Sequence, residues 1–413
     1  MSSVPQLQVL RSDFPVLERK IDGRQLVYLD SAATSLKPKS VIAAVTRFYE
    51  QYTANIHRGR HLLSEEASDR FEESRSKIAL FAGCSSDEVI FVRNTTEGLN
   101  LVPTLLGISR EDLVVAMADS HHSNLLPWRR CARFAEVEQR PDGSPDLDHL
   151  ESLLRHRPKL LAVTHCSNVT GGYAPLAEIV RLARASDVRV VLDAAQSAPH
   201  HRLTFREMGV DFLAFSGHKM LGPSGIGCLI GRSDLLSAAE PVHIGGGTVD
   251  AVGAEDWLLR RSPHRHEAGT PAIEAVCGLG AAVDYIETLG FDWIAAHERQ
   301  LSAALVAEAN KRSYIRPIGN LQDVQRAPLL SFAIEGCDDL RDLAKALSDA
   351  YGIMCRSGHL CAQPLVDAHT EGEVLRVSGY LYNTTGEIDL VFQVLDELTR
   401  AFARPPARGR TRS

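Results

Sequence analysis

Short apolar runs alternate with amphipathic stretches along the middle of the chain. Five of these runs have the length of buried strands: residues 113–117, 160–164, 188–192, 212–215 and 226–230. Between two of them, residues 176–185 show the three- and four-residue apolar spacing of a helix. Strands that alternate with helices form parallel sheets that are covered on both faces. The pattern therefore predicts an α/β fold with a largely parallel sheet.

The clearest helical pattern of the first third spans residues 65–81. Small or apolar side chains recur there at three- and four-residue spacing, for example at Ala67, Phe71 and Ile78. Ser64 stands where an N-cap is expected, and Gly83 follows the end of the pattern. We therefore expect a helix that begins after Ser64.

After Pro271 the pattern changes to two long helical stretches followed by separate strands. The helices are predicted at 272–289 and 293–312, and the strands at 329–334 and 374–378. These elements predict a second, smaller α/β lobe, to which residues 14–30 return either directly or at the seam between the lobes.

These expectations divide the chain into two domains and a tail. The predicted bounds are 31–295 for the large domain, 1–30 with 296–404 for the small domain, and 405–413 for a disordered tail rich in proline and arginine.

Charge and composition exclude several classes of protein. The 413 residues carry 45 basic and 52 acidic side chains, a formal charge of −7, so neither nucleic acid nor an anionic membrane is expected as a partner. No apolar run of about 18 residues and no secretory signal pattern is present in the sequence, which predicts a cytoplasmic protein. Eight cysteines without a C-x-x-C pair predict neither a disulfide framework nor a metal site.

A lysine and an aspartate stand at the ends of two predicted strands. Lys219 lies in Ser-Gly-His-Lys directly after the run at 212–215, and Asp193 follows the run at 188–192. Taken singly, Lys219 is compatible with a solvated charge and Asp193 with a helix cap. Together they are typical of a pyridoxal 5'-phosphate (PLP) site, in which the lysine forms a Schiff base and the carboxylate pairs with the ring nitrogen. The two residues therefore favour a cofactor site at the carboxyl edge of the sheet.

Polar segments follow three further strands. Hydroxyl and N–H groups at 93–98 precede a predicted helix and suit a phosphate, the histidines at 120–124 include one that can lie over a flat ring, and Ser167-Asn168 places an amide at another strand end. Each segment alone is compatible with ordinary capping. Five such segments in one chain favour a ligand site.

Ten segments resemble the class V aminotransferase superfamily of PLP enzymes, and within it the branch of group II cysteine desulfurases and selenocysteine lyases. They occur in order from about residue 25 to 390: YLDSAATS, NIHRGRHLLS, VRNTTEGLNLV, SHHSNLLPW, SNVTGG, LDAAQSAPH, FSGHKMLGPSGIGCLIG, HEAGTPAIEA, RSGHLCAQP and LRVSGYLYNT. The resemblance implies PLP fold type I, with a large domain whose mainly parallel sheet is covered by helices and a smaller C-terminal α/β domain.

The resemblance also implies a role for each matching residue in holding PLP. The matches are Lys219 for the Schiff base, Asp193 for the ring nitrogen, His121 for stacking and proton transfer, Asn168 and Gln196 for the ring hydroxyl, and Thr95, Thr96, Ser216 and His218 for the phosphate. Thr270 matches the threonine that reaches the phosphate of the other subunit. A homodimer with a shared active site is therefore implied.

On the substrate side, the resemblance implies that Arg376 grips the α-carboxylate of L-cysteine and that Cys361 is the nucleophile. Asn168, His57 and His359 are implied as further substrate-binding residues. The implied reaction converts L-cysteine to L-alanine and leaves a persulfide on Cys361, from which sulfur passes to an acceptor for iron–sulfur clusters or another sulfur metabolite. Cys355, after the run Gly-Ile-Met, is expected in the core.

Three positions depart from the motifs of the branch. Asn94 stands where glycine usually precedes the two threonines, Leu360 replaces the second histidine before the cysteine, and Thr248 follows the glycines at 245–247 where glutamate is common. These changes keep alternatives open. The chain is also compatible with selenocysteine lysis, C–S lysis, epimerisation or transamination in a specialised pathway, and with a non-catalytic protein of the same fold.

Overall fold

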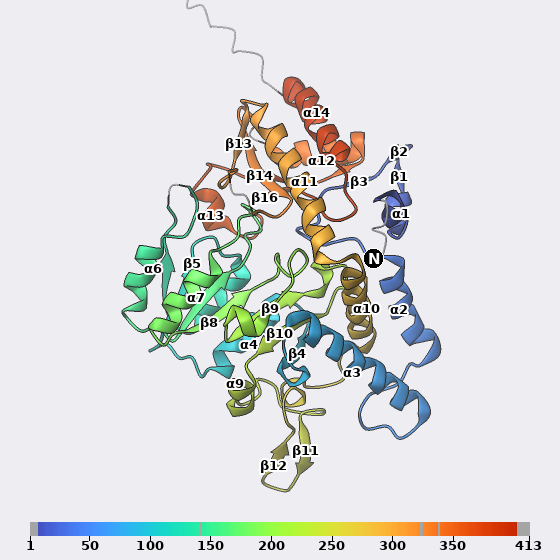
Figure 1. The fold of residues 1–413 in the computed structure, drawn as a ribbon, viewed down its shortest axis with the longest axis vertical. Helices are drawn as coiled ribbons and strands as arrows, with labels where there is room; N and C mark the ends of the chain where they lie inside the picture. The colour runs from blue at the N-terminus through green and yellow to red at the C-terminus, as the bar shows by residue number, and fades with distance from the viewer. Residues whose placement is uncertain (1–6, 141, 323–324, 338, 403–413) are drawn as a thin grey trace, which may run out of the picture.

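The computed structural model describes residues 7–140, 142–322, 325–337 and 339–402. At its centre lies a seven-stranded sheet of order β4-β10-β9-β8-β7-β5-β6 (Figure 1). The strands are β4 (Val89–Val92), β5 (Leu113–Met117), β6 (Arg133–Val137), β7 (Leu160–Thr164), β8 (Arg189–Asp193), β9 (Phe212–Ser216) and β10 (Gly227–Gly231). Within this described sheet β10 alone runs antiparallel to the other six strands. The predicted α/β fold with a largely parallel sheet is confirmed.

Helices cover both faces of this sheet, because alternate residues of each strand enter two different apolar cores. On β7, Leu161 and Val163 join the core that holds α2 (Lys39–Gln51), α3 (Leu62–Ala82), α7 (Leu176–Ala185) and α10 (Ile273–Leu289). Their neighbours Leu160 and Ala162 join the core beneath α4 (Thr95–Leu105), α5 (Leu126–Cys131) and α9 (Ser233–Ala238). Burial on both faces explains why these strands are apolar throughout instead of alternating.

The smaller lobe is built on a four-stranded antiparallel sheet of order β13-β14-β17-β16. Its strands are β13 (Ile315–Pro317), β14 (Leu329–Ile334), β16 (Arg356–Gly358) and β17 (Val374–Ser378), and its helices are α11 (Phe291–Asn310), α12 (Leu340–Tyr351), α13 (Gln363–Asp367) and α14 (Thr385–Phe402). Leu330, Phe332 and Val377 belong to a core separate from those of the large sheet.

Two segments cross between the lobes. The N-terminal segment places Phe14 in the large core, whereas Val27 and Leu29 enter the small one, where β3 (Val27–Tyr28) pairs in parallel with β15 (Ile353–Met354). Helix α11 changes core between Ile294 and Leu301. The domain bounds 31–295, 1–30 and 296–404 stay predictions, and the tail 405–413 lies outside the described residues.

Most predicted elements are observed within two residues of their expected ends, but one helix begins differently. Helix α3 begins at Leu62, three residues before the predicted start. His61 is the N-cap, and its ring accepts from the Ser64 N–H. The Ser64 hydroxyl instead donates to the Asn55 carbonyl at 2.7 Å. The prediction that Ser64 caps this helix is therefore wrong, because the helix already begins at Leu62 and the Ser64 side chain bonds to the preceding loop. No helix within the described ranges is long and apolar enough to cross a membrane.

Candidate active site

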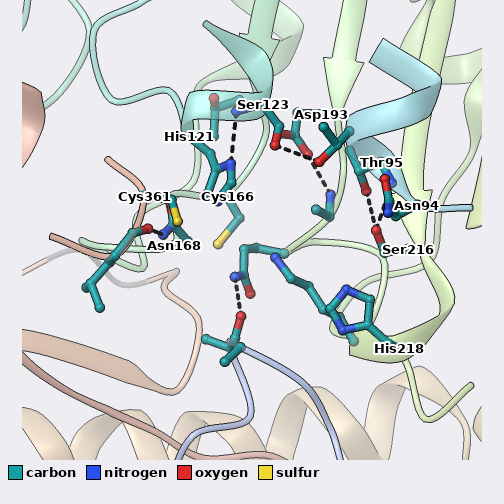
Figure 2. Close-up of a pocket in the computed structure, with 18 of the residues that line it drawn as sticks. Asn94, Thr95, His121, Ser123, Cys166, Asn168, Asp193, Ser216, His218 and Cys361 are labelled. Atoms are coloured by element: carbon teal, nitrogen blue, oxygen red, sulfur yellow. Dashed lines mark hydrogen bonds between the residues drawn. The ribbon is translucent and has the colours of Figure 1, made fainter. Parts of the chain in front are cut away.

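A cavity of about 260 Å³ opens at the carboxyl ends of β5, β7, β8 and β9. Eleven of the predicted site residues line it: Thr95, Thr96, His121, Asn168, Asp193, Gln196, Ser216, His218, Lys219, Cys361 and Arg376. In Figure 2, Asp193, Thr95, Ser216 and His218 lie on one side, and His121, Asn168 and Cys361 on the other. The parallel strands and the smaller lobe thus bring these residues to one pocket.

Lys219 lies in a short 3-10 turn that continues directly from β9. Burial, opposed by Asp193 and aided by Arg376, lowers the pKa of its ammonium group to about 8. A lysine with this pKa is partly neutral near neutral pH. Its amine is therefore suited to attack an aldehyde and to carry a proton.

Asp193 ends β8 and is only 5% exposed. One oxygen accepts from the Ala195 N–H at 2.9 Å. Burial raises the pKa of this carboxyl, whereas the Ala195 N–H and Lys219 favour the charged form. A carboxylate at this depth gains most from a cation placed in the pocket beside it.

His121 lies after β5, directly before the 3-10 turn His122–Asn124. Its Nδ1 accepts from the Ser123 N–H at 3.0 Å, and burial with Lys219 lowers the pKa of the ring to about 3. The ring is therefore neutral, and its remaining proton is on Nε2. A neutral imidazole is suited to stack on a flat ring and to pass a proton.

Hydroxyl groups surround the first turn of α4. The Thr95 and Ser216 hydroxyls lie 2.7 Å apart, and the Thr96 and Ser123 hydroxyls are also 2.7 Å apart. Burial lowers the pKa of the neighbouring His218 to about 4, so this ring is neutral. Neutral donors at a helix start form a cradle suited to a phosphate.

Asn94 is the N-cap of α4, and its side chain accepts from the Glu97 N–H at 3.0 Å. Its backbone is extended, with φ −174°. Glycine is not required in this conformation, so the departure at Asn94 does not strain the loop.

Two amides approach the pocket from β7 and β8. The Gln196 amide donates to the Ala32 carbonyl at 2.8 Å, and the Asn168 amide donates to the Leu360 carbonyl at 2.8 Å. The Asn168 Oδ1 atom is buried without a hydrogen-bond partner within the described part of the chain. This oxygen is therefore available to accept a hydrogen bond from a ligand in the pocket.

Arg376, on β17, is 2% exposed. Its Nη1 donates to the Asn168 carbonyl at 3.0 Å, and its Nη2 lies 3.2 Å from Asp30. Its Nε is buried and has no partner among the described residues. One side of the guanidinium is thus held by the protein, and an unused donor remains.

Cys361 lies in the loop between β16 and α13. All eight cysteines lie in described ranges, and Cys361 alone is exposed. Cys355 packs against the smaller core, as expected, and burial raises the pKa of its thiol to about 12. Exposure and position distinguish Cys361 from the other thiols.

Three predicted residues lie outside this pocket. Thr270 and His57 border a separate cavity. His57 contacts Glu72 at 2.9 Å and lies near His264, and the donor atoms of these three side chains are within 4.8 Å of one another, a spacing compatible with a metal ion. His359 points to Asp367, with 3.4 Å between Nε2 and Oδ1. The substrate role predicted for His57 and His359 and the cofactor role predicted for Thr270 stay predictions.

The structure also adds residues to the site. Arg356 and Cys166 line the pocket, and Asp30 pairs with Arg376. Arg356 lies opposite Arg376 across the β16–β17 pair, and residues that lie opposite each other share one face of the sheet. The alternation of side chains along these strands could therefore have predicted that Arg356 lines the pocket. Asp30 had no such signal, because its contact with Arg376 crosses between lobes. Cys166 follows the end of β7, so its position at a strand end was the available signal.

The residues present fit PLP. The unpartnered Asn168 Oδ1 suits a ring hydroxyl, the buried Asp193 carboxylate suits a protonated ring nitrogen, and the cradle at Thr95 suits the phosphate. Lys219 lies in the same pocket.

Comparison with known proteins agrees with this geometry. The profile of the family described as Aminotransferase class-V matches residues 27–391. A probable cysteine desulfurase of Streptomyces coelicolor is 38% identical over 97% of this chain and 100% of its own, and a cysteine desulfurase of Klebsiella pneumoniae is 41% identical over 92% and 95%.

Solved structures give the same result. A cysteine desulfurase from Thermococcus onnurineus superposes with a TM-score of 0.90 at 36% identity, and the cysteine desulfurase CsdA from Escherichia coli with 0.87 at 32%. Each match covers 97% of this chain and 100% of the other. With a family profile over most of its length and relatives of this similarity, the chain belongs to the PLP-dependent class-V aminotransferase family, as a cysteine desulfurase-like member.

Proposed function

We propose that the protein is a PLP-dependent cysteine desulfurase that converts L-cysteine to L-alanine and leaves the sulfur as a persulfide on Cys361. One observation carries the proposal: the single exposed cysteine lines the same cavity as Lys219 and Arg376. A nucleophilic thiol, a partly neutral lysine and a carboxylate-binding guanidinium are the groups that this reaction needs.

The residues of the pocket divide into cofactor and substrate groups. Lys219 would hold the aldehyde carbon of PLP and Asp193 its ring nitrogen, Gln196 and Asn168 would face its hydroxyl, and His121 would stack on its ring. Thr95, Thr96, Ser216 and His218 would hold its phosphate. When bound, PLP supplies an electron sink for the bonds at the substrate Cα. The neutral rings of His121 and His218 add no cation that would compete with the ring nitrogen for Asp193.

Substrate binding rests on Arg376. Its unused Nε donor and the adjoining Nη atoms suit a carboxylate, and Asp30 with the Asn168 carbonyl holds the guanidinium in place. With the substrate held at its carboxylate, the Lys219 amine is the base that removes the proton from Cα. The neutral His121 passes protons between the substrate and Lys219.

Sulfur transfer falls to Cys361. Its thiolate attacks the sulfur of the bound cysteine, so an S–S bond forms while the Cβ–S bond breaks. The electron pair of the broken bond stays with the carbon skeleton, which takes up a proton at Cβ and leaves as alanine. The sulfur remains on Cys361 as a persulfide for an acceptor protein or thiol.

A second copy of the chain completes the proposed site. Thr270 and His57 border their own cavity, away from Lys219 of the same chain, so a homodimer is the arrangement in which they serve a pocket. The hairpin β11 (Val249–Val252) and β12 (Trp257–Leu259) projects from the body (Figure 1), and the Val249 carbonyl accepts from Arg58, the neighbour of His57, at 2.8 Å. Its Val252, Trp257 and Leu258 are more than half exposed, as expected for a surface that a partner covers.

The proposed compartment is the cytoplasm, where thiols stay reduced.

The test compares Cys361→Ala with Cys131→Ala as a matched control on a partly exposed cysteine outside the pocket. With L-cysteine, Cys361→Ala should keep the PLP absorbance and lose persulfide and alanine formation, whereas Cys131→Ala should behave like the wild type. Unchanged turnover in Cys361→Ala would contradict the proposal. Turnover of selenocysteine that survives this change would favour a lyase.

A further inference from the structure

The backbone before and at the nucleophile adopts a sterically unfavourable conformation. Leu360 has φ +54° and Cys361 has φ +57°, so two successive residues other than glycine lie in the left-handed region. Such a conformation persists only where surrounding groups hold it. The groups that hold this loop therefore control where the Cys361 thiol points.

His122 holds the loop at two points. Its backbone N–H donates to the Cys361 carbonyl at 2.7 Å, and its ring Nε2 accepts from the Gln363 N–H at 3.2 Å. These two contacts hold the backbone from the Cys361 carbonyl to the Gln363 N–H. The histidine lies in the 3-10 turn that follows β5, so the large sheet fixes its position.

A second clamp holds Leu360. Its carbonyl accepts from the Asn168 amide at 2.8 Å, and its side chain is 6% exposed in a small apolar cluster with Val169 and Val374. In this chain an apolar leucine thus anchors the position before the nucleophile. The part of the loop that follows Leu360 is held by His122.

From these contacts we propose that His122 is a positioning residue, whose ring and backbone hold the left-handed Cys361 loop so that the thiol faces the pocket. The inference rests on the proposed function, because it concerns the residue that receives the sulfur. It assigns to His122 no contact with substrate or cofactor.

The ring performs this task in its neutral form. Nε2 accepts a hydrogen bond, so the ring proton is on Nδ1. Burial, Arg129 and His359 all lower the pKa of His122, and the His121 ring lies 6.2 Å away between centroids. The acceptor is therefore present at neutral pH.

The test uses the full-length holoenzyme in three variants. His122→Ala removes the acceptor, and His122→Gln restores one on a side chain of similar reach. His149→Ala is the matched control, since His149 Nδ1 also accepts from a backbone N–H, that of Glu138 at 3.2 Å, outside the pocket. Hydrogen exchange of residues 359–366 without substrate reports on the loop directly, and kcat and KM for L-cysteine report on the reaction.

In His122→Ala the Gln363 amide should exchange about tenfold faster, and kcat should fall about tenfold, with KM and the PLP absorbance unchanged. His122→Gln should recover most of both losses, and His149→Ala should change neither. Unchanged exchange in His122→Ala, an equal loss in His149→Ala, or no recovery in His122→Gln would overturn the inference. A wild-type protein that forms no persulfide while the exchange differences hold would instead refute the proposed function alone.

Discussion

The two halves of the pocket are built in different ways. The half around Lys219 consists of residues at the carboxyl ends of parallel strands, where backbone geometry is regular. The half around Cys361 is a short loop of the smaller lobe with two left-handed residues, held by contacts from the large sheet. The cofactor side is therefore rigid through its sheet, whereas the nucleophile side is rigid only through its neighbours.

The largest expected effect tests the cofactor side. Lys219→Ala removes both the amine that anchors PLP and the base at Cα, so kcat should fall by about 10³-fold or more. The absorbance of the lysine-bound cofactor should disappear as well. Steady-state assays and absorbance spectra check this, and Lys159→Ala, on a half-exposed lysine outside the pocket, is the control. Retained turnover would show that the regular half does not carry the chemistry.

The next effect concerns Arg376, where the two halves meet at the substrate. Arg376→Lys keeps the charge but loses the planar donor set, so KM for L-cysteine should rise about 10- to 100-fold with a smaller change in kcat. Kinetic measurement of both constants separates the two effects. A fall in kcat alone would place the arginine in another role.

A pH experiment addresses Lys219 itself. Its pKa is lowered from 10.5 to about 8, so the neutral amine becomes abundant above pH 8 instead of above pH 10. In the protein stripped of cofactor, the rate of PLP uptake should rise with pH to a plateau, with a midpoint near pH 8. Stopped-flow absorbance measures it, and a midpoint near 10 would mean that Lys219 is solvated.

The smallest effect is expected at Asn94. Because this residue is extended and acts as a helix cap, Asn94→Gly should change PLP affinity less than about twofold and cost only a few tenths of a kcal/mol. Asn94→Ala removes the cap and should cost about 1 kcal/mol of unfolding free energy. Thermal unfolding and PLP titration check both variants. A large gain in affinity for Asn94→Gly would show that the departure strains the phosphate cradle.

The same contrast explains what the sequence could predict. Lys219, Asp193 and Thr95 were predictable because strand ends follow from apolar runs, and the ends of parallel strands meet at one edge. The strands β14 and β17 of the smaller lobe were likewise predictable from their apolar runs.

The contacts of the loop were not predictable in this way. Asp30 and His122 reach their partners across large sequence separations, and no local pattern encodes such pairs. Ser64 was predicted as a cap, but helix α3 begins at Leu62, and the Ser64 hydroxyl donates to the Asn55 carbonyl in the loop before the helix. The predicted roles of Thr270, His57 and His359 depend on a second subunit or on the bound substrate, which a single chain does not contain.

The most direct measurement of the central claim is the location of sulfur after one turnover. The holoenzyme is incubated with L-cysteine in the absence of an acceptor, alanine is quantified, and the persulfide is mapped by mass spectrometry after alkylation. The account predicts about one alanine per chain and a persulfide on Cys361. Alanine without a persulfide on Cys361, or a persulfide on another of the eight cysteines, would contradict it.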